Sequence, residues 1–82
     1  FSGAYFGGAN LNGANFSGAN LNTATLDDTD SINADFSGAN LYSATFIRAY
    51  LYGADFKNAN VIGTNTDYAD FEKLEKDKNE NI

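Results

Sequence analysis

The amino-acid sequence predicts an all-β solenoid built from a tandem repeat of five residues. Large apolar residues occupy thirteen of the fifteen positions from 1 to 71 in steps of five. Alanine fills twelve of the fourteen positions that come two places before them, and seven of the eight glycines fall two places after them. A period of five matches neither an α-helix nor a simple strand, so the backbone must turn a corner once per repeat.

Each position of the repeat has a predicted role, as in Ala14-Asn15-Phe16-Ser17-Gly18. Alternation along a short extended segment points both the alanine and the large residue inward. Glycine provides the positive φ that a tight corner needs. Asparagine or aspartate before the large residue caps the turn by accepting hydrogen bonds from nearby backbone groups.

Triplets such as Ala9-Asn10-Leu11, Ala34-Asp35-Phe36 and Ala54-Asp55-Phe56 carry the resemblance to a known family. The tandem pattern resembles that of pentapeptide-repeat proteins, which are abundant in cyanobacteria and plastids, and it covers residues 1–71. The resemblance implies a right-handed quadrilateral parallel β-helix with four repeats, or twenty residues, per coil and just under four coils. The sequence departs from the pattern at Thr29-Asp30-Ser31, where both inward positions are polar.

A twenty-residue coil stacks each residue on the one twenty positions later. This register predicts specific neighbours: an aromatic ladder of Phe16, Phe36 and Phe56, an aliphatic ladder of Leu21, Leu41 and Val61, and the pairs Asp28–Arg48 and Asp35–Asp55.

The chain divides into a β-helix over residues 1–71 and a charged C-terminal helix or tail over residues 72–82. Phe71 and Leu74 have the spacing to lay one helix face on the last coil as a cap. Phe1, Phe6 and Leu11 have no predicted cap, so we expect homo-oligomers to form end to end through the first coil. The chain opens in mid-repeat, as a processed form or a fragment would.

The composition and charge of the chain exclude several kinds of ligand and metal site. The chain carries a net charge of −6, which argues against direct binding of nucleic acid. Cysteine, histidine, methionine and tryptophan are absent, so a disulfide, a Cys/His zinc site and haem ligation are excluded, and no cofactor is expected. No apolar run reaches the ~20 residues of a membrane span. We expect a soluble protein, either cytoplasmic or exported to a lumen or periplasm.

Two groups of outward-facing residues are candidate sites. The first is a predicted interaction surface of exposed aromatic and branched residues, which are also common on plain strand surfaces: Tyr42, Ile47, Tyr50, Tyr52 and Ile62. The second is an acidic patch of Asp27, Asp28 and Asp30. The segment 27–33 fits a calcium-binding loop poorly, which favours a decayed repeat or a bulge with solvated carboxylates.

The composition favours a non-catalytic structural or protein-interaction scaffold over an enzyme, because there is no histidine or cysteine and a packed interior leaves no substrate pocket of ~300 Å³. The partner is expected to be a protein. The resemblance also implies an alternative, a DNA mimic that binds a type II topoisomerase such as gyrase and protects against quinolones. Residues 1–71 carry a net charge of −5 over roughly 18 Å, about half the charge of the same length of duplex.

Overall fold

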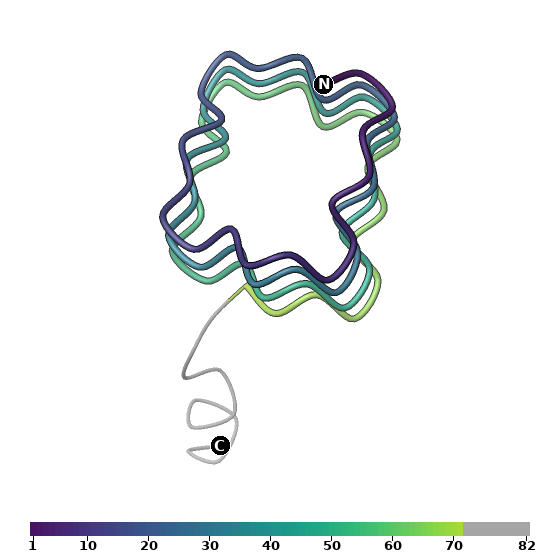
Figure 1. The fold of residues 1–82 in the computed structure, drawn as a ribbon. Coiled ribbons are helices and arrows are strands. Elements are labelled where there is room, and N and C mark those ends of the chain that lie inside the picture. The colour runs from purple at the N-terminus through teal and green to yellow at the C-terminus, as the bar shows by residue number, and fades with distance from the viewer. Residues whose placement is uncertain (72–82) are drawn as a thin grey trace, which may run out of the picture.

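The computed structural model describes residues 1–71, which wind into stacked four-sided coils (Figure 1). In that view the chain runs clockwise from the N-terminus as the coils recede, so the solenoid is right-handed. Residues 72–82 lie outside the described residues, and with them the predicted C-terminal helix and the cap formed by Leu74.

The coils are held in a register of twenty residues. Single bridging residues pair in parallel with residues twenty positions away, as in Tyr5 with Thr25, Asn15 with Asp35, and Asn40 with Asn60. Residues 1–20, 21–40 and 41–60 therefore form three successive coils, and residues 61–71 begin a fourth. Within residues 1–71 there is no helix and no strand longer than one bridging residue. The predicted twenty-residue spacing is confirmed.

The repeats turn their corners in one common way, although in residues 26–30 the Leu26 carbonyl accepts from the Thr29 hydroxyl instead of a backbone N–H. The carbonyl of the large residue accepts a hydrogen bond from the alanine N–H three positions later, for example Ala9 N to Phe6 O at 2.9 Å. The residue before that alanine has a φ between +57° and +76° in all fourteen repeats, as a type II turn requires. Seven of these residues are the predicted glycines. The other seven, such as Arg48 and Tyr68, hold the strained conformation because the surrounding ladder imposes it.

A repeat that follows Asn or Asp and lies between two described coils, such as residues 36–40, satisfies all five of its backbone N–H groups, which explains why so short a unit is stable. Three donate to neighbouring coils, one closes the turn, and the fifth donates to the Asn or Asp side chain two residues earlier. The second coil shows the set, with Phe36 N to Asp55 O at 2.7 Å, Gly38 N to Lys57 O at 2.9 Å, Asn40 N to Ala19 O at 2.9 Å, Ala39 N to Phe36 O at 3.0 Å and Ser37 N to Asp35 Oδ1 at 2.9 Å.

The interior is filled by the two inward columns of each repeat. The predicted aromatic ladder is confirmed, since the ring of Phe36 stacks on Phe16 at 5.4 Å and on Phe56 at 5.2 Å, with interplanar angles of 3° and 6°. Leu21 and Leu41 of the aliphatic ladder are fully buried, whereas Val61 in the last described coil is half exposed. At the other end of the solenoid Phe1 is exposed, and the end-to-end association predicted there stays a prediction.

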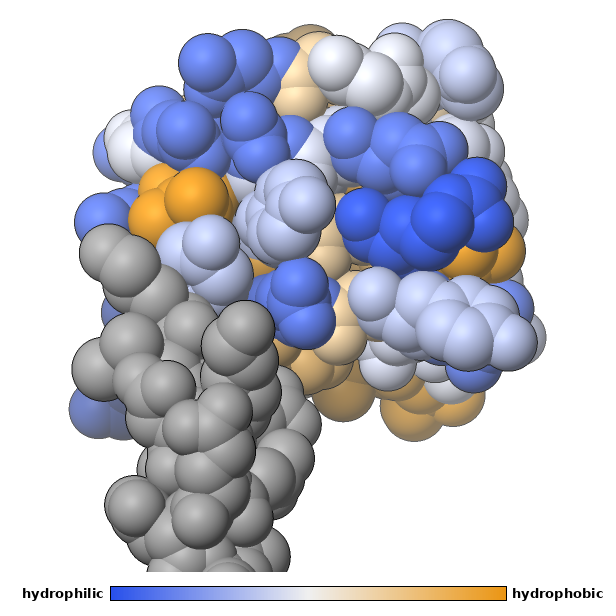
Figure 2. Space-filling view, turned by 90° about the horizontal axis from the view of Figure 1, so that it is seen from below, coloured by the Kyte–Doolittle hydropathy of each residue, from blue (hydrophilic) through white to orange (hydrophobic). Residues whose placement is uncertain are grey.

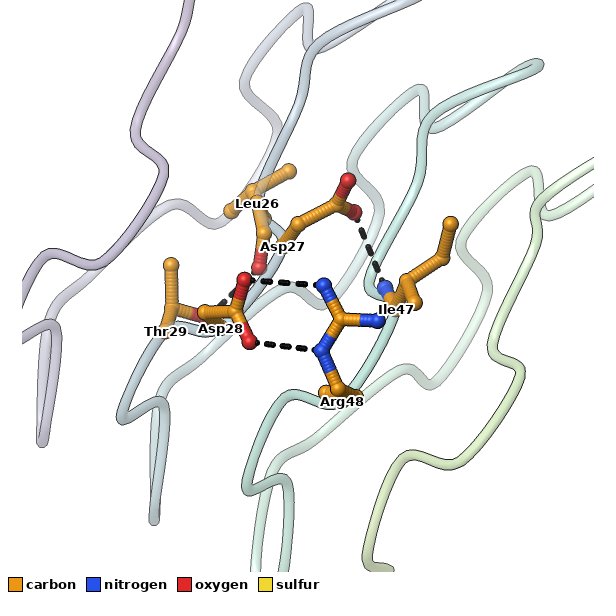
Figure 3. A network of polar contacts seen from close by, with 6 residues as sticks. All are labelled: Leu26, Asp27, Asp28, Thr29, Ile47 and Arg48. Carbon is orange, nitrogen blue, oxygen red and sulfur yellow. Dashed lines mark hydrogen bonds and ion pairs between the residues drawn. The ribbon is translucent and has the colours of Figure 1, made fainter.

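Thr29 and Ser31 form a regular repeat rather than a bulge. Both side chains are fully buried, and their hydroxyl oxygens lie 2.9 Å apart. The Thr29 hydroxyl donates to the Leu26 carbonyl at 2.9 Å (Figure 3). Asp30, between them, pairs with Asn10 and Tyr50 in the ladder. The two inward hydroxyls thus satisfy each other, which removes most of the cost of burying them.

Candidate functional site

The outer surface of the solenoid has two unlike sides. Because the register is twenty residues, one side of the solenoid comprises the stacked segments 1–5, 18–25, 38–45 and 58–65. These segments contain no charged residue at all, and we call them the uncharged side. Half a coil away lie the stacked segments 27–33, 47–53 and 67–70, which carry five carboxylates and one arginine. We call this second group the banded side.

The banded side consists of rows of different character. In the second coil the outer row is acidic, in the third coil it is mainly aromatic and aliphatic, and in the fourth coil it is again acidic. The rows are Asp27, Asp28 and Asp30; then Ile47, Arg48, Tyr50 and Tyr52; then Asp67, Tyr68 and Asp70. Figure 2 views this side of the molecule and shows hydrophilic and hydrophobic residues lying next to one another.

The three aspartates of the acidic patch differ in the contacts that their carboxylates make. Asp27 Oδ1 accepts a hydrogen bond from the Ile47 backbone N–H at 2.9 Å (Figure 3). Asp28 binds the Arg48 guanidinium through both oxygens, at 2.9 and 3.2 Å, as the register predicts. No hydrogen-bond donor within residues 1–71 pairs with the Asp30 carboxylate. Asp27 and Asp28 therefore link neighbouring coils, whereas the Asp30 carboxylate makes no such link among residues 1–71.

The Asp28–Arg48 pair shifts the protonation of both groups. The two hydrogen bonds from Arg48, helped by its charge, lower the pKa of Asp28 below its ordinary value. In return the same contacts with Asp28 raise the pKa of Arg48. Both side chains are more than half exposed, so the pair is a modest clamp between two coils.

The structure divides the five residues of the predicted interaction surface between the two sides. Ile47, Tyr50 and Tyr52 lie on the banded side, directly over the acidic patch. Tyr42 and Ile62, which stack on each other twenty positions apart, lie on the uncharged side, half a coil from Tyr52. The five residues share the third and fourth coils, but they occupy two opposite parts of the twenty-residue perimeter.

Tyr50 and Tyr52 are the most prominent pair of the aromatic row. Their ring centroids lie 6.2 Å apart, and Tyr50 is 45% exposed. A hollow of about 410 Å³ beside them is lined by Ile32, Asn33, Tyr52 and Gly53. Gly53 makes room for the side chain of Asn33 at the edge of this hollow, since an added Cβ would overlap that amide.

Among residues 1–71 no acceptor pairs with the backbone N–H of Tyr52, a residue that lines this hollow. In most repeats the equivalent N–H is capped by Asn or Asp two residues earlier, but that position is Tyr50 here. Asn12 and Asp27 cap the equivalent N–H groups of Ile32 and Ile47 from the coil before. Ile32 stands in the corresponding place below Tyr52 and has no acceptor, and nothing in residues 1–71 takes its role. The signal was present in the sequence as the missing Asn or Asp at position 50.

The described residues offer little for catalysis. A second hollow of about 310 Å³ opens at the end of the described coils, lined only by aromatic, valine and threonine side chains: Phe46, Phe56, Val61, Thr64, Thr66 and Phe71. Both hollows are open to solvent at the end or the outer surface of the solenoid, whereas the predicted close packing concerned its interior, where the core side chains are buried. No carboxylate of residues 1–71 lines either hollow. Within residues 1–71 no three carboxylates come together as metal ligands.

The stacked carboxylates of Asp35 and Asp55 are neighbours in the ladder, as predicted. Repulsion between them would raise the pKa of Asp35, but its pKa is lowered instead. The causes are hydrogen bonds from the Ser37 hydroxyl, at 2.6 Å, and the Ser37 backbone N–H. Asp35 is therefore a turn cap, and it lacks the raised pKa that a general acid near neutral pH requires.

These features define a β-helical solenoid with a sided outer surface. The family model for pentapeptide repeats matches eight copies over residues 1–30 and 32–65, and the chain belongs to this family. The match is interrupted only at Ser31, where the inward residue is a buried hydroxyl rather than a large apolar side chain.

Solved structures are similar to this chain, and those of the Arabidopsis protein and QnrB1 show the same fold. A pentapeptide repeat protein from the thylakoid lumen of Arabidopsis thaliana is 39% identical over 77% of this chain and 48% of its own, with a TM-score of 0.64. HetL, a protein involved in heterocyst differentiation regulation in the cyanobacterium Nostoc, is 32% identical over 76% of this chain and 32% of its own, with a TM-score of 0.46. QnrB1, a plasmid-mediated fluoroquinolone resistance protein, is 19% identical over 89% of this chain and 44% of its own, with a TM-score of 0.52.

The chain spans about half the length of the Arabidopsis protein and about a third of HetL. A search of curated proteins found no match. Among the described residues no helix is long and apolar enough to cross a membrane.

Proposed function

We propose that the protein is a non-catalytic scaffold that binds another protein through its banded side. The observation that carries the proposal is the sidedness of the outer surface. Five of the seven carboxylates in residues 1–71, together with Ile47, Tyr50 and Tyr52, gather on one side of a rod whose opposite side has no charge. Plain solubility requires no such segregation of charge.

The aromatic row suits protein recognition. Tyrosine combines a large apolar ring with a polar tip and loses little conformational entropy on binding, so it is enriched where proteins meet. Tyr50 and Tyr68 are exposed, and Tyr52 lines a hollow that can receive a partner's side chain. The inner columns carry the fold, which leaves these outer side chains free to serve recognition.

The proposal is tested by comparing partner capture by the two sides. The double variant Tyr50→Thr with Tyr52→Ser uses residues that this chain already carries at the same repeat positions, Thr25 and Ser17, so the coil is preserved. Tyr42→Ser is the matched control on the uncharged side. Immobilised wild-type protein is expected to retain a specific protein from a lysate of the source organism, the control to retain it too, and the double variant to lose it. Equal retention by all three proteins would contradict the proposal.

A second candidate function is mimicry of DNA at a type II topoisomerase, and the concentration of carboxylates on the banded side favours it. Duplex DNA presents phosphates around its whole circumference, whereas the uncharged side presents no carboxylate, so we place this function second. The likeness to QnrB1 is one of fold. A gyrase supercoiling assay decides the matter. Inhibition that is lost in Asp28→Lys with Asp30→Lys would support mimicry, and absence of inhibition would exclude gyrase as the target.

A further inference from the structure

We infer that the partner of the banded side is a basic, extended protein segment that lies along the third coil and places one apolar side chain in the hollow beside Tyr52. The inference rests on the proposed function and specifies the chemistry of its partner. Three features support it: the order of the acidic and aromatic rows, the tyrosine rings, and the hollow and uncapped N–H at Tyr52.

The order of the rows favours a segment that runs along the coil. Acidic rows lie one coil before and one coil after the aromatic row, at the ~4.8 Å spacing of adjacent strands. Asp30 and Asp70 flank Tyr50 directly, since both pair with it in the ladder. A chain lying over the third coil thus has carboxylates within reach of its long basic side chains on both edges. Arg48, the one cation in these rows, is already bound to Asp28 and offers little repulsion.

The rings of the aromatic row add to the attraction for cations. Tyr50 and Tyr52 are tilted at 58° to each other, so they present different edges and faces to a partner. A lysine or arginine side chain over a tyrosine ring is attracted by the ring's quadrupole. Tyr68, which stacks on Arg48 in the same column and is 84% exposed, extends this aromatic surface into the fourth coil.

The end of the aromatic row favours one apolar anchor and a peptide backbone. The hollow is lined by Ile32, by the ring of Tyr52, by Asn33 and by the flat backbone of Gly53, with no carboxylate among them. An apolar side chain fits these walls better than a basic one. The open N–H of Tyr52 beside the hollow is a donor that a carbonyl of an extended segment can satisfy, as strands do along the rest of the ladder.

Other occupants fit the surface less well. A nucleic acid would bring phosphates against five carboxylates, and a second copy of this chain would bring another banded side of the same charge. A partner that is apolar but uncharged would leave Asp30, Asp67 and Asp70 unused.

The test measures fluorescence anisotropy of labelled pentapeptides with the full 82-residue chain. The probes are Lys-Lys-Leu-Lys-Lys, the same peptide with glycine in place of leucine, and Glu-Glu-Leu-Glu-Glu. We expect the first to bind, the second to bind more weakly because it lacks the anchor, and the third not to bind. Tyr50→Thr with Tyr52→Ser is expected to weaken binding of the first peptide, while Tyr42→Ser leaves it unchanged.

Matched charge variants separate this site from general attraction to an acidic protein. Asp30→Asn with Asp70→Asn removes two carboxylates of the banded side, and we expect binding to weaken roughly fivefold. Asp35→Asn with Asp55→Asn removes two stacked carboxylates elsewhere and keeps the turn caps, because asparagine caps the same turn at Asn40 and Asn60. Equal weakening by the two pairs would overturn the inference. So would binding of the leucine and glycine peptides with equal affinity.

The outcomes also distinguish this inference from the proposed function. If none of the basic peptides binds but a protein is captured in a way that depends on Tyr50 and Tyr52, the proposed scaffold function stands. The inference that its partner is a basic segment is then overturned. Failure of both experiments would overturn the two together. Self-association of the free protein that is lost in Tyr50→Thr with Tyr52→Ser would identify a second copy as the occupant and would also overturn the inference.

Discussion

The uncharged side and the banded side are built on the same backbone, yet they cap their turns differently. On the uncharged side Asn20, Asn40 and Asn60 each cap the N–H two residues later, at 3.1 Å in every case. On the banded side Asn65 caps Asp67 in this way at 2.9 Å, but the caps of Ile32 and Ile47 come from the coil before, and Asp27 and Tyr52 have none among the described residues. The repeat is regular where the surface is plain and irregular where charge and aromatic rings gather. Such local departures from a fold's own rules are typical of functional surfaces.

The largest expected effect tests whether the two sides share one interior. Phe36→Ala removes the middle ring of the aromatic ladder and is expected to lower the free energy of unfolding by ~3–5 kcal/mol. Ser37→Ala, its neighbour on the outer surface, is the control and should cost ~1 kcal/mol or less. Denaturant unfolding followed by circular dichroism measures both. If the two variants unfold alike, position 36 does not lie in the shared core.

A smaller loss of stability is expected when a glycine is replaced by alanine, and its size should differ between the banded side and the uncharged side. Gly18 and Gly53 have similar positive φ values, and each alanine substitution should cost ~1–2 kcal/mol for that reason alone. Gly18 has open space where a Cβ would stand, whereas Gly53 faces the Asn33 amide. Gly53→Ala should therefore cost more in the same unfolding experiment. Asn33→Ala has a cost of its own, because Asn33 also has a positive φ, so the double variant is compared with that single variant. In the Asn33→Ala background Gly53→Ala should cost no more than Gly18→Ala, and a persisting excess would contradict this explanation.

Deleting a side chain that caps a turn is expected to lower the free energy of unfolding by a still smaller amount. Asp27→Ala leaves the Ile47 N–H without its acceptor and is expected to cost ~1 kcal/mol. Asp27→Asn keeps an acceptor oxygen and should cost less. Asn40→Ala is the matching cap deletion on the uncharged side and should resemble Asp27→Ala. Should Asp27→Asn prove as damaging as Asp27→Ala, the charge of Asp27 would matter rather than its hydrogen bond.

The smallest effect concerns the dependence of stability on pH. The pKa of Asp28 is lower in the fold than in the unfolded chain, so its pairing with Arg48 stabilises the protein above the unfolded pKa. This contribution is lost as the pH falls through the lower folded pKa. Wild type and Arg48→Gln should therefore differ slightly in stability near neutral pH and converge in acid. NMR titration should show the pKa of Asp28 rising in the variant, and an unchanged titration would argue against the pair in solution.

Much of the interior could be predicted from the sequence because the repeat determines it. Spacing alone places Phe36 inside and Gly38 at a corner, and the twenty-residue coil implied by the family resemblance places Arg48 over Asp28. The positive φ at Arg48 and Tyr68 could be expected from their phase in the repeat but not from their residue type. The spacing was a stronger constraint than local propensity, since the ladder on both sides of each coil enforces the turn.

The candidate site was only half predictable. The acidic patch and three of the five surface residues belong to one surface, because position around the twenty-residue perimeter, and not the order of the repeats, decides which outer residues are neighbours. The hydrogen bond from Ile47 to Asp27 spans twenty residues and follows no local capping rule. The hollow at Tyr52 depends on Gly53 and Asn33 being stacked on each other, and its size depends on side-chain packing that no spacing rule describes.

The five-residue repeat also gives insertions and deletions an unusual meaning. Loss of one whole repeat, such as residues 56–60, keeps every later residue in its inward or outward phase. It turns all that follows by one side of the coil, so Asp67 and Asp70 would move from the column of Asp27 and Asp30 to the uncharged side. In most folds a deletion threatens the core and spares the distant surface. In this one a deletion can spare the core and rearrange the surface, so related chains of different length can share a scaffold and present different sides.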